Sequence, residues 1–377
     1  MDDLLMVPGP TPLPPEVRAA LTLPMVNHRS APFRAVEEEV QAGLRQVFDT
    51  TAGRIFVLPA AGTGGLEAAI QNLVEPGQTV LSVTMGSFGD RWANLARVFG
   101  AQVETLASEW GSYPRPEELA ERLAADREHR IRVILLTHNE TSTGVLLPLE
   151  AMARARGDHP ALILVDAVSA LAATPLRMDE WGIDCVVAGS QKALMTPPGL
   201  AVLALSERAV ATMRAVKGPR GYFDLRGYLK PDNTTNLPYT PAVSLFYGLR
   251  ASLKLILGAG LEASYARHER LGAMARRGLE ALGLKLVADP DAYSPTVTAA
   301  YLEGADEFRT RLRGLGVTIA GGQGKLAGRI IRIGHVGFVN PVDMLGTLAA
   351  MEVTMGREHA GHAVAAAETV LEEVAVR

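Results

Sequence analysis

The feature that most constrains the fold is an alternation of apolar runs with amphipathic stretches between about residues 55 and 205. The apolar runs cover residues 55–59, 79–83, 133–137, 162–166, 185–188 and 201–205. Helical patterns lie between them, at residues 66–73, 91–99, 117–125 and 149–155. Strands that are apolar on both faces need helices on both sides of their sheet. We therefore predict an α/β fold with a mostly parallel sheet, whose ligands gather at the carboxyl ends of the strands.

The length of the chain, 377 residues, favours two domains over one simple core. Residues 1–15 contain Pro8-Gly9-Pro10 and further prolines, so we predict an extended arm that leads into a helix at Glu16. We assign residues 16–255 to a large domain and 256–377 to a smaller α/β domain. Residues 217–241 indicate an irregular segment, and residues 243–282 a long helix. In the smaller domain we expect strands at 296–300 and 330–333 and helices at 308–315 and 344–351.

The composition excludes several classes of partner. A formal net charge of -4 gives no reason to expect nucleic acid or an anionic membrane surface. No apolar run approaches the roughly 20 residues that span a bilayer, and the acidic start does not resemble a signal peptide. The single cysteine, Cys185, cannot form an internal disulfide, which fits a reducing compartment. We therefore expect a cytoplasmic protein that acts on small molecules.

A lysine and an aspartate follow neighbouring apolar runs. Lys192 comes just after the run at 185–188, within Gly189-Ser190-Gln191-Lys192, and Asp166 closes the run at 162–166. Taken alone, a lysine after a strand is typical of an exposed surface residue. A lysine can also form a Schiff base with a carbonyl. With an acid at a nearby strand end, the pair indicates pyridoxal 5′-phosphate, with Lys192 on its aldehyde and Asp166 on its ring nitrogen.

Two further segments fit the phosphate and the ring of such a cofactor. Residues 61–65, Ala-Gly-Thr-Gly-Gly, connect an apolar run to a helical pattern, and small residues let backbone N–H groups approach an anion. Thr63 as a simple helix N-cap remains an alternative. Phe88 stands between Gly86 and Gly89, where its ring could be exposed for stacking or buried under the loop.

Polar groups suited to a substrate lie further along the chain. Residues 137–144 follow a strand and hold more hydroxyl and amide groups than a simple turn requires. Arg332 lies in a predicted strand, and a planar guanidinium binds a carboxylate through two hydrogen bonds. A strand arginine commonly extends to solvent instead. Arg329 would face the opposite side of the strand from Arg332 and is the weaker candidate.

Three of these segments carry a resemblance to a known family. They are Gly-Ser-Gln-Lys-Ala-Leu-Met-Thr-Pro-Pro-Gly at 189–199, Thr-His-Asn-Glu-Thr-Ser-Thr-Gly-Val-Leu at 137–146 and Val-Asp-Ala-Val-Ser at 165–169. In this order they resemble the class V aminotransferases of fold type I, in the branch of alanine–glyoxylate, serine–glyoxylate and serine–pyruvate aminotransferases. The resemblance extends from Pro8 to Gly334. It implies a seven-stranded sheet and pyridoxal 5′-phosphate as cofactor.

The resemblance also implies a role for individual residues. Lys192 would form the Schiff base, and Asp166 would pair with the pyridine nitrogen. Val168 and Phe88 would cover the two faces of the ring, although many relatives have tryptophan where Phe88 stands. The phosphate would be held by Thr63, Gly64, Gly65 and Gln191. Thr141 would lie on the phenolic side of the ring, and Arg332 would bind the substrate carboxylate.

A second subunit is expected to complete the site. In the dimers of this family, a threonine before a proline reaches the phosphate of the other subunit, and Thr240 matches it. Relatives often have tyrosine three residues earlier, where Leu237 stands, and Tyr239 is a possible substitute. The resemblance therefore implies a homodimer with active sites at the interface.

The implied reaction is a ping-pong transamination between alanine or serine and a 2-oxo acid such as glyoxylate or pyruvate. Lys192 would move the proton of the substrate Cα, first as a base and then as an acid. If Arg29, beside His28, contacts a side-chain carboxylate, aspartate or glutamate is expected as a substrate; a solvated loop is an equal alternative for both residues. A desulfurase needs a nucleophilic cysteine, and Cys185 lies inside an apolar run. A non-catalytic protein is expected to have lost Lys192, Asp166 or Arg332.

Overall fold

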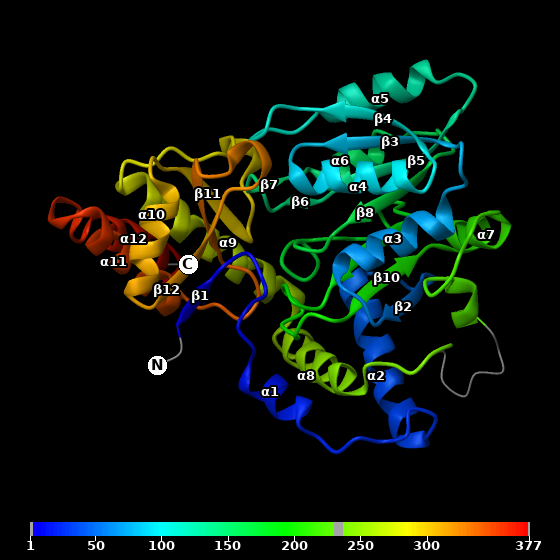
Figure 1. The fold of residues 1–377 in the computed structure, drawn as a ribbon, viewed down its shortest axis with the longest axis horizontal. Coiled ribbons are helices and arrows are strands. Elements are labelled where there is room, and N and C mark those ends of the chain that lie inside the picture. Colours follow the sequence, from blue (N-terminus) through cyan, green and yellow to red (C-terminus); the bar gives the residue numbers. More distant parts are fainter. Residues whose placement is uncertain (1–2, 230–236, 376–377) are drawn as a thin grey trace.

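The computed structural model describes residues 3–229 and 237–375, and the larger of its two parts is built on a seven-stranded sheet (Figure 1). Along the sheet the strands are β2 (Arg54–Leu58), β10 (Ala201–Leu205), β9 (Cys185–Gly189), β8 (Leu162–Asp166), β5 (Ile131–Thr137), β3 (Thr79–Thr84) and β4 (Gln102–Ala107). The strands from β9 to β4 are parallel, and β10 is antiparallel to both neighbours. The predicted α/β class and mostly parallel sheet are confirmed. Strand β4 was not predicted, because its sequence QVETLA is an edge strand with exposed polar positions.

Helices pack closely on this sheet. This packing fixes where each helix begins relative to the ends of the strands. The helices of this part are α1 (Pro15–Leu21), α2 (Ala31–Phe48), α3 (Gly62–Leu73), α4 (Ser87–Val98), α5 (Pro116–Ala125), α6 (Leu149–Arg154), α7 (Glu207–Ala215) and α8 (Val243–Ala259). Helix α3 packs on β9 and β10, and α4 on β3, β4 and β5. A Cβ atom at Gly65 would lie 2.7 Å from Val187 Cγ1 and 2.9 Å from the Cβ of Ala201. Glycine at this position therefore lets α3 approach the sheet.

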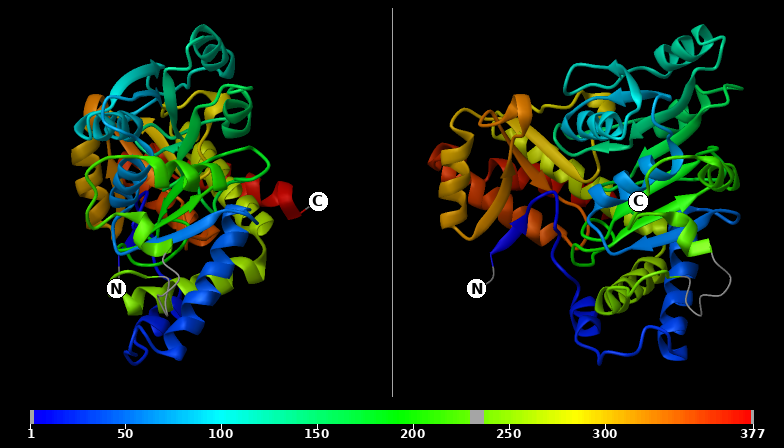
Figure 2. Two further views of the ribbon diagram at one scale, coloured as in Figure 1. Left: turned by 90° about the vertical axis from the view of Figure 1, so that its right-hand side faces the viewer. Right: turned by 45° about the vertical axis from the view of Figure 1, so that its right-hand side comes forward.

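A four-stranded sheet with its own helices forms the second part of the molecule (Figures 1 and 2). Its strand order is β1 (Leu4–Met6), β12 (Val317–Gly321), β13 (Ile330–Gly334) and β11 (Val297–Tyr301). The helices are α9 (Leu261–Ala281), α10 (Ala305–Gly314), α11 (Pro341–Met355) and α12 (His362–Ala375). Strand β12 and helix α12 were not predicted, whereas the strands expected at 296–300 and 330–333 and the helices expected at 308–315 and 344–351 overlap β11, β13, α10 and α11.

The beginning of the chain belongs to this smaller sheet. Strand β1 pairs in parallel with β12, and Met6 is buried in the core of the second part. Residues 8–14 form neither helix nor strand, as their prolines predict, and α1 begins at Pro15, one residue before the predicted start. Strand β1 was not predicted, and the assignment of residues 1–15 to an extended arm stays a prediction. The chain crosses from the smaller part to the larger part over residues 7–14, which lies beside Lys192, as described below.

The predicted long helix over residues 243–282 is two helices. Helices α8 and α9 meet at Gly260 at an angle of 89°. The φ angle of Gly260 is 88°, a value that residues with side chains rarely adopt, so the helix ends there. Among the described residues no single helix is long and apolar enough to cross a membrane. Helices α8 and α9 reach the required length and apolar composition only when the bent pair is counted as one segment. The predicted domain boundary at residues 255 and 256 falls inside α8 and stays a prediction.

The segment at residues 217–241 is irregular, apart from a short 3-10 helix, Leu225–Leu229, where the structure describes it. Residues 230–236 of this segment lie outside the described residues.

Candidate active site

Lys192 lies three residues beyond β9, and the beginning of the chain covers its side chain. Lys192 Nζ donates a hydrogen bond to the carbonyl oxygen of Pro8. Gly9 has a φ angle of 109°, and a Cβ atom there would lie 2.5 Å from Lys192 Cδ and 2.7 Å from Nζ. Glycine is therefore required at position 9 for both its φ angle and its contact with the lysine. Pro8 and Gly9 therefore contact the Lys192 side chain directly.

Asp166 ends β8 and is buried beside the same amine. Its Oδ1 accepts a hydrogen bond of 2.9 Å from the backbone N–H of Val168. Burial raises the pKa of Asp166 to about 7, the negative charge of Glu140 adds to this rise, and Lys192 and Arg91 oppose it. A positive charge held against this carboxylate would favour its ionised form. Burial lowers the pKa of Lys192 to about 8, with a further contribution from Arg332. The amine therefore loses its proton more readily than an exposed lysine.

Arg332 brings a guanidinium from the smaller sheet to this site. It lies on β13, opposite Ala299 on β11 and Ala320 on β12. Its Nε donates to the carbonyl oxygen of Gly321 at 2.7 Å, and its Nη1 to that of Thr141 at 2.8 Å. Burial lowers its pKa to about 10, so Arg332 remains protonated at neutral pH. The neighbouring Arg329 is exposed, as expected for the weaker candidate.

The glycine-rich turn forms the start of α3. Ala61 occupies the N-cap position and, among the described residues, no side chain caps this helix. Thr63 lies inside the first turn, so its alternative role as the N-cap was wrong. The amides of Gly64 and Gly65 donate to the carbonyl oxygen of Ala61, at 2.8 and 3.3 Å. An uncapped helix start offers N–H donors and a partial positive charge to an anion.

Val168 and Gln191, to which the resemblance assigned cofactor contacts, lie near this turn. A Cβ atom at Gly62 would lie 2.9 Å from Val168 Cγ2, so Val168 packs directly against the start of α3. Gln191 carries a buried Oε1 atom that has no hydrogen-bond partner among the described residues. A buried amide oxygen without a partner is costly unless a ligand donates to it.

Phe88 and Thr141 line the other side of the site. Phe88 is the second residue of α4 and is half-buried, and the guanidinium carbon of Arg91 lies 4.9 Å from the centre of its ring. The Thr141 hydroxyl donates to Ser169 Oγ at 2.8 Å. The backbone N–H of Phe88 donates to Glu140, the residue before Thr141, to which the sequence assigned no role. The unusual density of polar groups at 137–144 was the available signal for it.

Thr240 and His28 lie together, away from Lys192. Both line an open pocket of about 530 Å³, together with Met25 and residues 241–245. None of the residues that line this pocket belongs to the group around Lys192, Asp166 and Arg332. Within one chain, Asp166 and Arg332 lie within electrostatic range of Lys192, and Val168 packs on the start of α3, whereas Thr240 lines this separate pocket. Arg29 is exposed.

Tyr239 and Leu237 are occupied elsewhere. Tyr239 stacks on Tyr222, with ring centres 5.0 Å apart and planes at 19°. Leu237 is buried in the larger core. The substitution of Tyr239 for the tyrosine of relatives stays a prediction.

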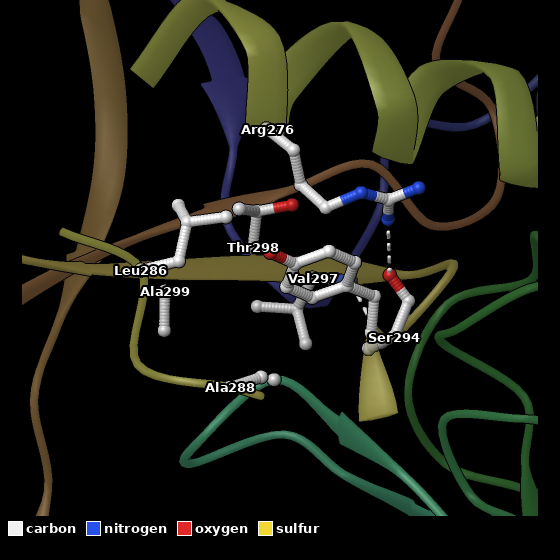
Figure 3. Close-up of a pocket in the computed structure, with 9 residues that line it drawn as sticks. Arg276, Leu286, Ala288, Ser294, Val297, Thr298 and Ala299 are labelled. Carbon is white, nitrogen blue, oxygen red and sulfur yellow. Dashed lines mark hydrogen bonds between the residues drawn. The ribbon is translucent and has the colours of Figure 1, made fainter. Parts of the chain in front are cut away.

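A second, smaller cavity lies between α9 and β11 (Figure 3). Its volume is about 10 Å³, enough for about one water molecule. Arg276 extends from α9 across it and donates to the carbonyl oxygen of Ser294 at 3.4 Å. This cavity is too small to hold a cofactor.

Cys185 cannot serve as a nucleophile. It is fully buried within β9, and burial raises the pKa of its thiol. A thiol attacks as the thiolate and needs access to its substrate. The alternative of a desulfurase therefore has no suitable cysteine in this chain, since Cys185 is its single one.

Comparison with known proteins gives the family. The model of the class V aminotransferases matches residues 8–323. The chain belongs to this family. It is 39% identical to the L-aspartate–glyoxylate aminotransferase of Paracoccus denitrificans over 93% of the chain and 90% of that protein. It is 37% identical to the serine–glyoxylate aminotransferase of Methylorubrum extorquens, over 98% of the chain and 96% of that protein.

A solved structure agrees. The ureidoglycine–glyoxylate aminotransferase of Bacillus subtilis superposes with a TM-score of 0.92, at 31% identity, over 98% of both chains. The protein is thus a fold type I aminotransferase whose cofactor is pyridoxal 5′-phosphate. The residues of the site fit this cofactor: an amine of lowered pKa, a buried carboxylate, an uncapped helix start and an unpaired amide oxygen lie around one place.

Proposed function

We propose that the enzyme transfers the amino group of a small amino acid, alanine or serine, to glyoxylate or pyruvate by ping-pong kinetics. The observation that carries this proposal is the grouping of Lys192, Asp166 and Arg332. Both partners lie within electrostatic range of the amine: Arg332 lowers the pKa of Lys192, and Asp166 raises it. This group brings the Lys192 amine together with the Asp166 carboxylate, which would pair with the ring nitrogen, and with the Arg332 guanidinium, which would bind the substrate carboxylate. The relatives from Paracoccus denitrificans, Methylorubrum extorquens and Bacillus subtilis are all glyoxylate aminotransferases, which favours glyoxylate as the acceptor.

Each site residue has a proposed role. Asp166 pairs with the ring nitrogen, Val168 and Phe88 hold the two ring faces, and Thr141 lies near the phenolic oxygen. The proposed phosphate contacts are Thr63, Gly64, Gly65 and Gln191, with Thr240 supplied by a partner subunit. The bound cofactor withdraws electrons from the substrate Cα and so makes its hydrogen acidic. Lys192 Nζ removes that proton and later returns one, and the Pro8 carbonyl orients the amine between these steps.

The substrate pair is tested by combining purified enzyme with amino donors and 2-oxo acids. The donors are alanine, serine, aspartate and glutamate; the acceptors are glyoxylate, pyruvate, oxaloacetate and 2-oxoglutarate. We expect the highest kcat/KM for alanine or serine with glyoxylate. Aspartate as the preferred donor would contradict this choice and support the alternative of an aspartate aminotransferase. In that case Arg29→Leu should weaken aspartate alone and leave alanine unchanged.

A homodimer with shared active sites is also proposed. The pocket that contains His28 and Thr240 is also lined by Met25, an apolar side chain with an exposed fraction of 68%, and Leu23, two residues earlier in the chain, is 44% exposed. Exposed apolar groups beside a pocket are typical of an interface. Sedimentation of the enzyme at micromolar concentration tests this directly, since a monomer would contradict it.

The cytoplasmic location and the domain boundary at residue 256 are proposed on the residue patterns alone.

Replacing Arg332 by lysine should weaken carboxylate binding. Lysine keeps the charge but cannot form two parallel hydrogen bonds, and it would leave the carbonyls of Gly321 and Thr141 without their donor. We expect kcat/KM to fall about 10²-fold or more, mainly through a higher KM for both the amino acid and the 2-oxo acid. Steady-state kinetics measure this. Arg329→Lys, at the exposed neighbour, is the matched control and should leave kcat/KM unchanged.

A further inference from the structure

Glu140 is a fully buried carboxylate that accepts four hydrogen bonds. It lies in the short strand β6 (Asn139–Glu140) and has no exposed surface. Oε2 accepts from the backbone N–H groups of Phe88 and Gly89, both at 3.0 Å. Oε1 accepts from the N–H of Ser142 at 3.0 Å and from its hydroxyl at 2.5 Å. Each carboxylate oxygen therefore binds a different segment of the chain.

The packing around Glu140 restricts the position of its carboxylate. A Cβ atom at Gly86 would lie 2.5 Å from Glu140 Cδ and 2.6 Å from Ser142 Oγ, so the chain before α4 passes in direct contact with the carboxylate. The N-cap residue of α4 is Gly86, which has no side chain to cap the helix. Glu140 supplies this function from another segment, and its negative charge suits the positive start of a helix.

The two segments that Glu140 joins are those that carry opposite sides of the proposed site. On one side, its bond goes to the amide of Phe88 itself. On the other, Ser142 follows Thr141, whose carbonyl oxygen accepts the 2.8 Å hydrogen bond from Arg332 Nη1. A chain of direct hydrogen bonds and adjacent residues thus leads from the ring-stacking side chain through Glu140 to the substrate-binding arginine.

We propose that Glu140 is a positioning residue, which holds Phe88 and Arg332 in place by joining the start of α4 to the Thr141–Ser142 segment. The inference rests on the proposed function for what Phe88 and Arg332 contact. A carboxylate that served only to stabilise the fold would affect unfolding without affecting substrate or cofactor binding selectively.

The substitution Glu140→Gln separates the two sides. The amide keeps the shape of the carboxylate but has one acceptor oxygen and one NH₂ group. The Phe88 and Gly89 amides can only donate, whereas the Ser142 hydroxyl can also accept. The glutamine oxygen is therefore expected to stay with Phe88 and Gly89, and the NH₂ group to turn toward Ser142, whose N–H then loses its acceptor. Glu140→Ala removes both sides.

Different results are expected for the two variants of the holoenzyme. Glu140→Gln should raise KM for both substrates about 10-fold, with the cofactor absorbance band and its dissociation rate near those of the wild type. Glu140→Ala should raise KM as well, shift the absorbance band, and increase the rate of cofactor dissociation about 10-fold or more. Absorbance spectra, dilution into a cofactor trap and steady-state kinetics supply these readouts.

Asp126→Asn is the matched control. Asp126 is also a buried carboxylate that accepts two backbone hydrogen bonds, from Arg130 at 3.1 Å and Ile131 at 2.7 Å, but it lies between α5 and β5. It should lower the thermal midpoint without changing KM or the absorbance band. If the Glu140 variants behave like Asp126→Asn, with lower thermal stability and unchanged binding, the inference is wrong.

Hydrogen–deuterium exchange of the cofactor-free protein separates this inference from the proposed function. Glu140→Gln should speed exchange at Ser142 and not at Phe88 and Gly89, and Glu140→Ala should speed it at all three. If the wild type neither binds the cofactor nor transaminates, the proposed function fails, while exchange still decides whether Glu140 holds both segments. If exchange in Glu140→Ala equals that in the wild type, the inference fails even in an active enzyme.

Discussion

Replacing Lys192 by alanine should abolish the visible absorbance of lysine-bound cofactor and reduce turnover by about 10⁴-fold or more. Its Nζ is the amine that lies under the Pro8 carbonyl and within electrostatic range of both Asp166 and Arg332. In the proposed mechanism one atom both binds the cofactor and moves the substrate Cα proton, so its loss removes two functions together. A Lys192→Ala enzyme with wild-type turnover would end the proposal. Lys285→Ala, at an exposed lysine, is the control and should change neither property.

The acidity of Lys192 gives this prediction a pH dependence. Burial lowers the pKa of the amine to about 8, and only the neutral amine attacks a carbonyl. In the cofactor-free enzyme, the rate of reaction with pyridoxal 5′-phosphate should therefore rise with pH up to about 8 and then level off. An ordinary lysine would show a rise continuing toward its usual pKa of about 10.4. Stopped-flow absorbance at a series of pH values measures the difference.

The strand-end chemistry could be predicted from the sequence because it depends on local patterns. Apolar runs mark β8 and β9, and the residues that end or follow such runs, Asp166 and Lys192, must meet at one edge of a parallel sheet. Gly260 shows the limit of such patterns. Apolar periodicity continues across it, and only its φ angle of 88° reveals that α8 and α9 are separate.

The parts that were missed depend on contacts between distant segments. Strand β1 has three residues and precedes a proline-rich stretch, so its pairing with β12 has no local signal. Glu140 was visible as one polar residue among several, but its partners Phe88 and Gly89 are about 50 residues away. Thr240 and His28 line one pocket although they are also far apart in the sequence. Family resemblance assigned a role to Thr240, whereas no pattern in the chain predicted that the two would be neighbours.

Replacing Asp166 by asparagine should lower kcat/KM by about 10³-fold while leaving the fold intact. Asparagine has nearly the same shape, and its amide oxygen can still accept from the N–H of Val168. It carries no charge, so it cannot keep the ring nitrogen of the cofactor protonated, and electron withdrawal from the substrate Cα weakens. Asp126→Asn makes the same change at a buried carboxylate between α5 and β5, away from the Lys192 group, and should retain wild-type kcat/KM. Activity of Asp166→Asn within tenfold of the wild type would contradict the pairing.

The raised pKa of Asp166 makes cofactor binding a second test of the same residue. Because burial places this pKa at about 7, the carboxyl is mostly neutral below that pH and mostly ionised above it. A cationic ring nitrogen favours the ionised form, so cofactor affinity should fall as pH decreases through about 7 toward 5.5. The amide of Asp166→Asn does not titrate, so that part of the pH dependence should vanish in the variant. Equal pH dependence in both proteins would show that another group, and not Asp166, pairs with the ring nitrogen.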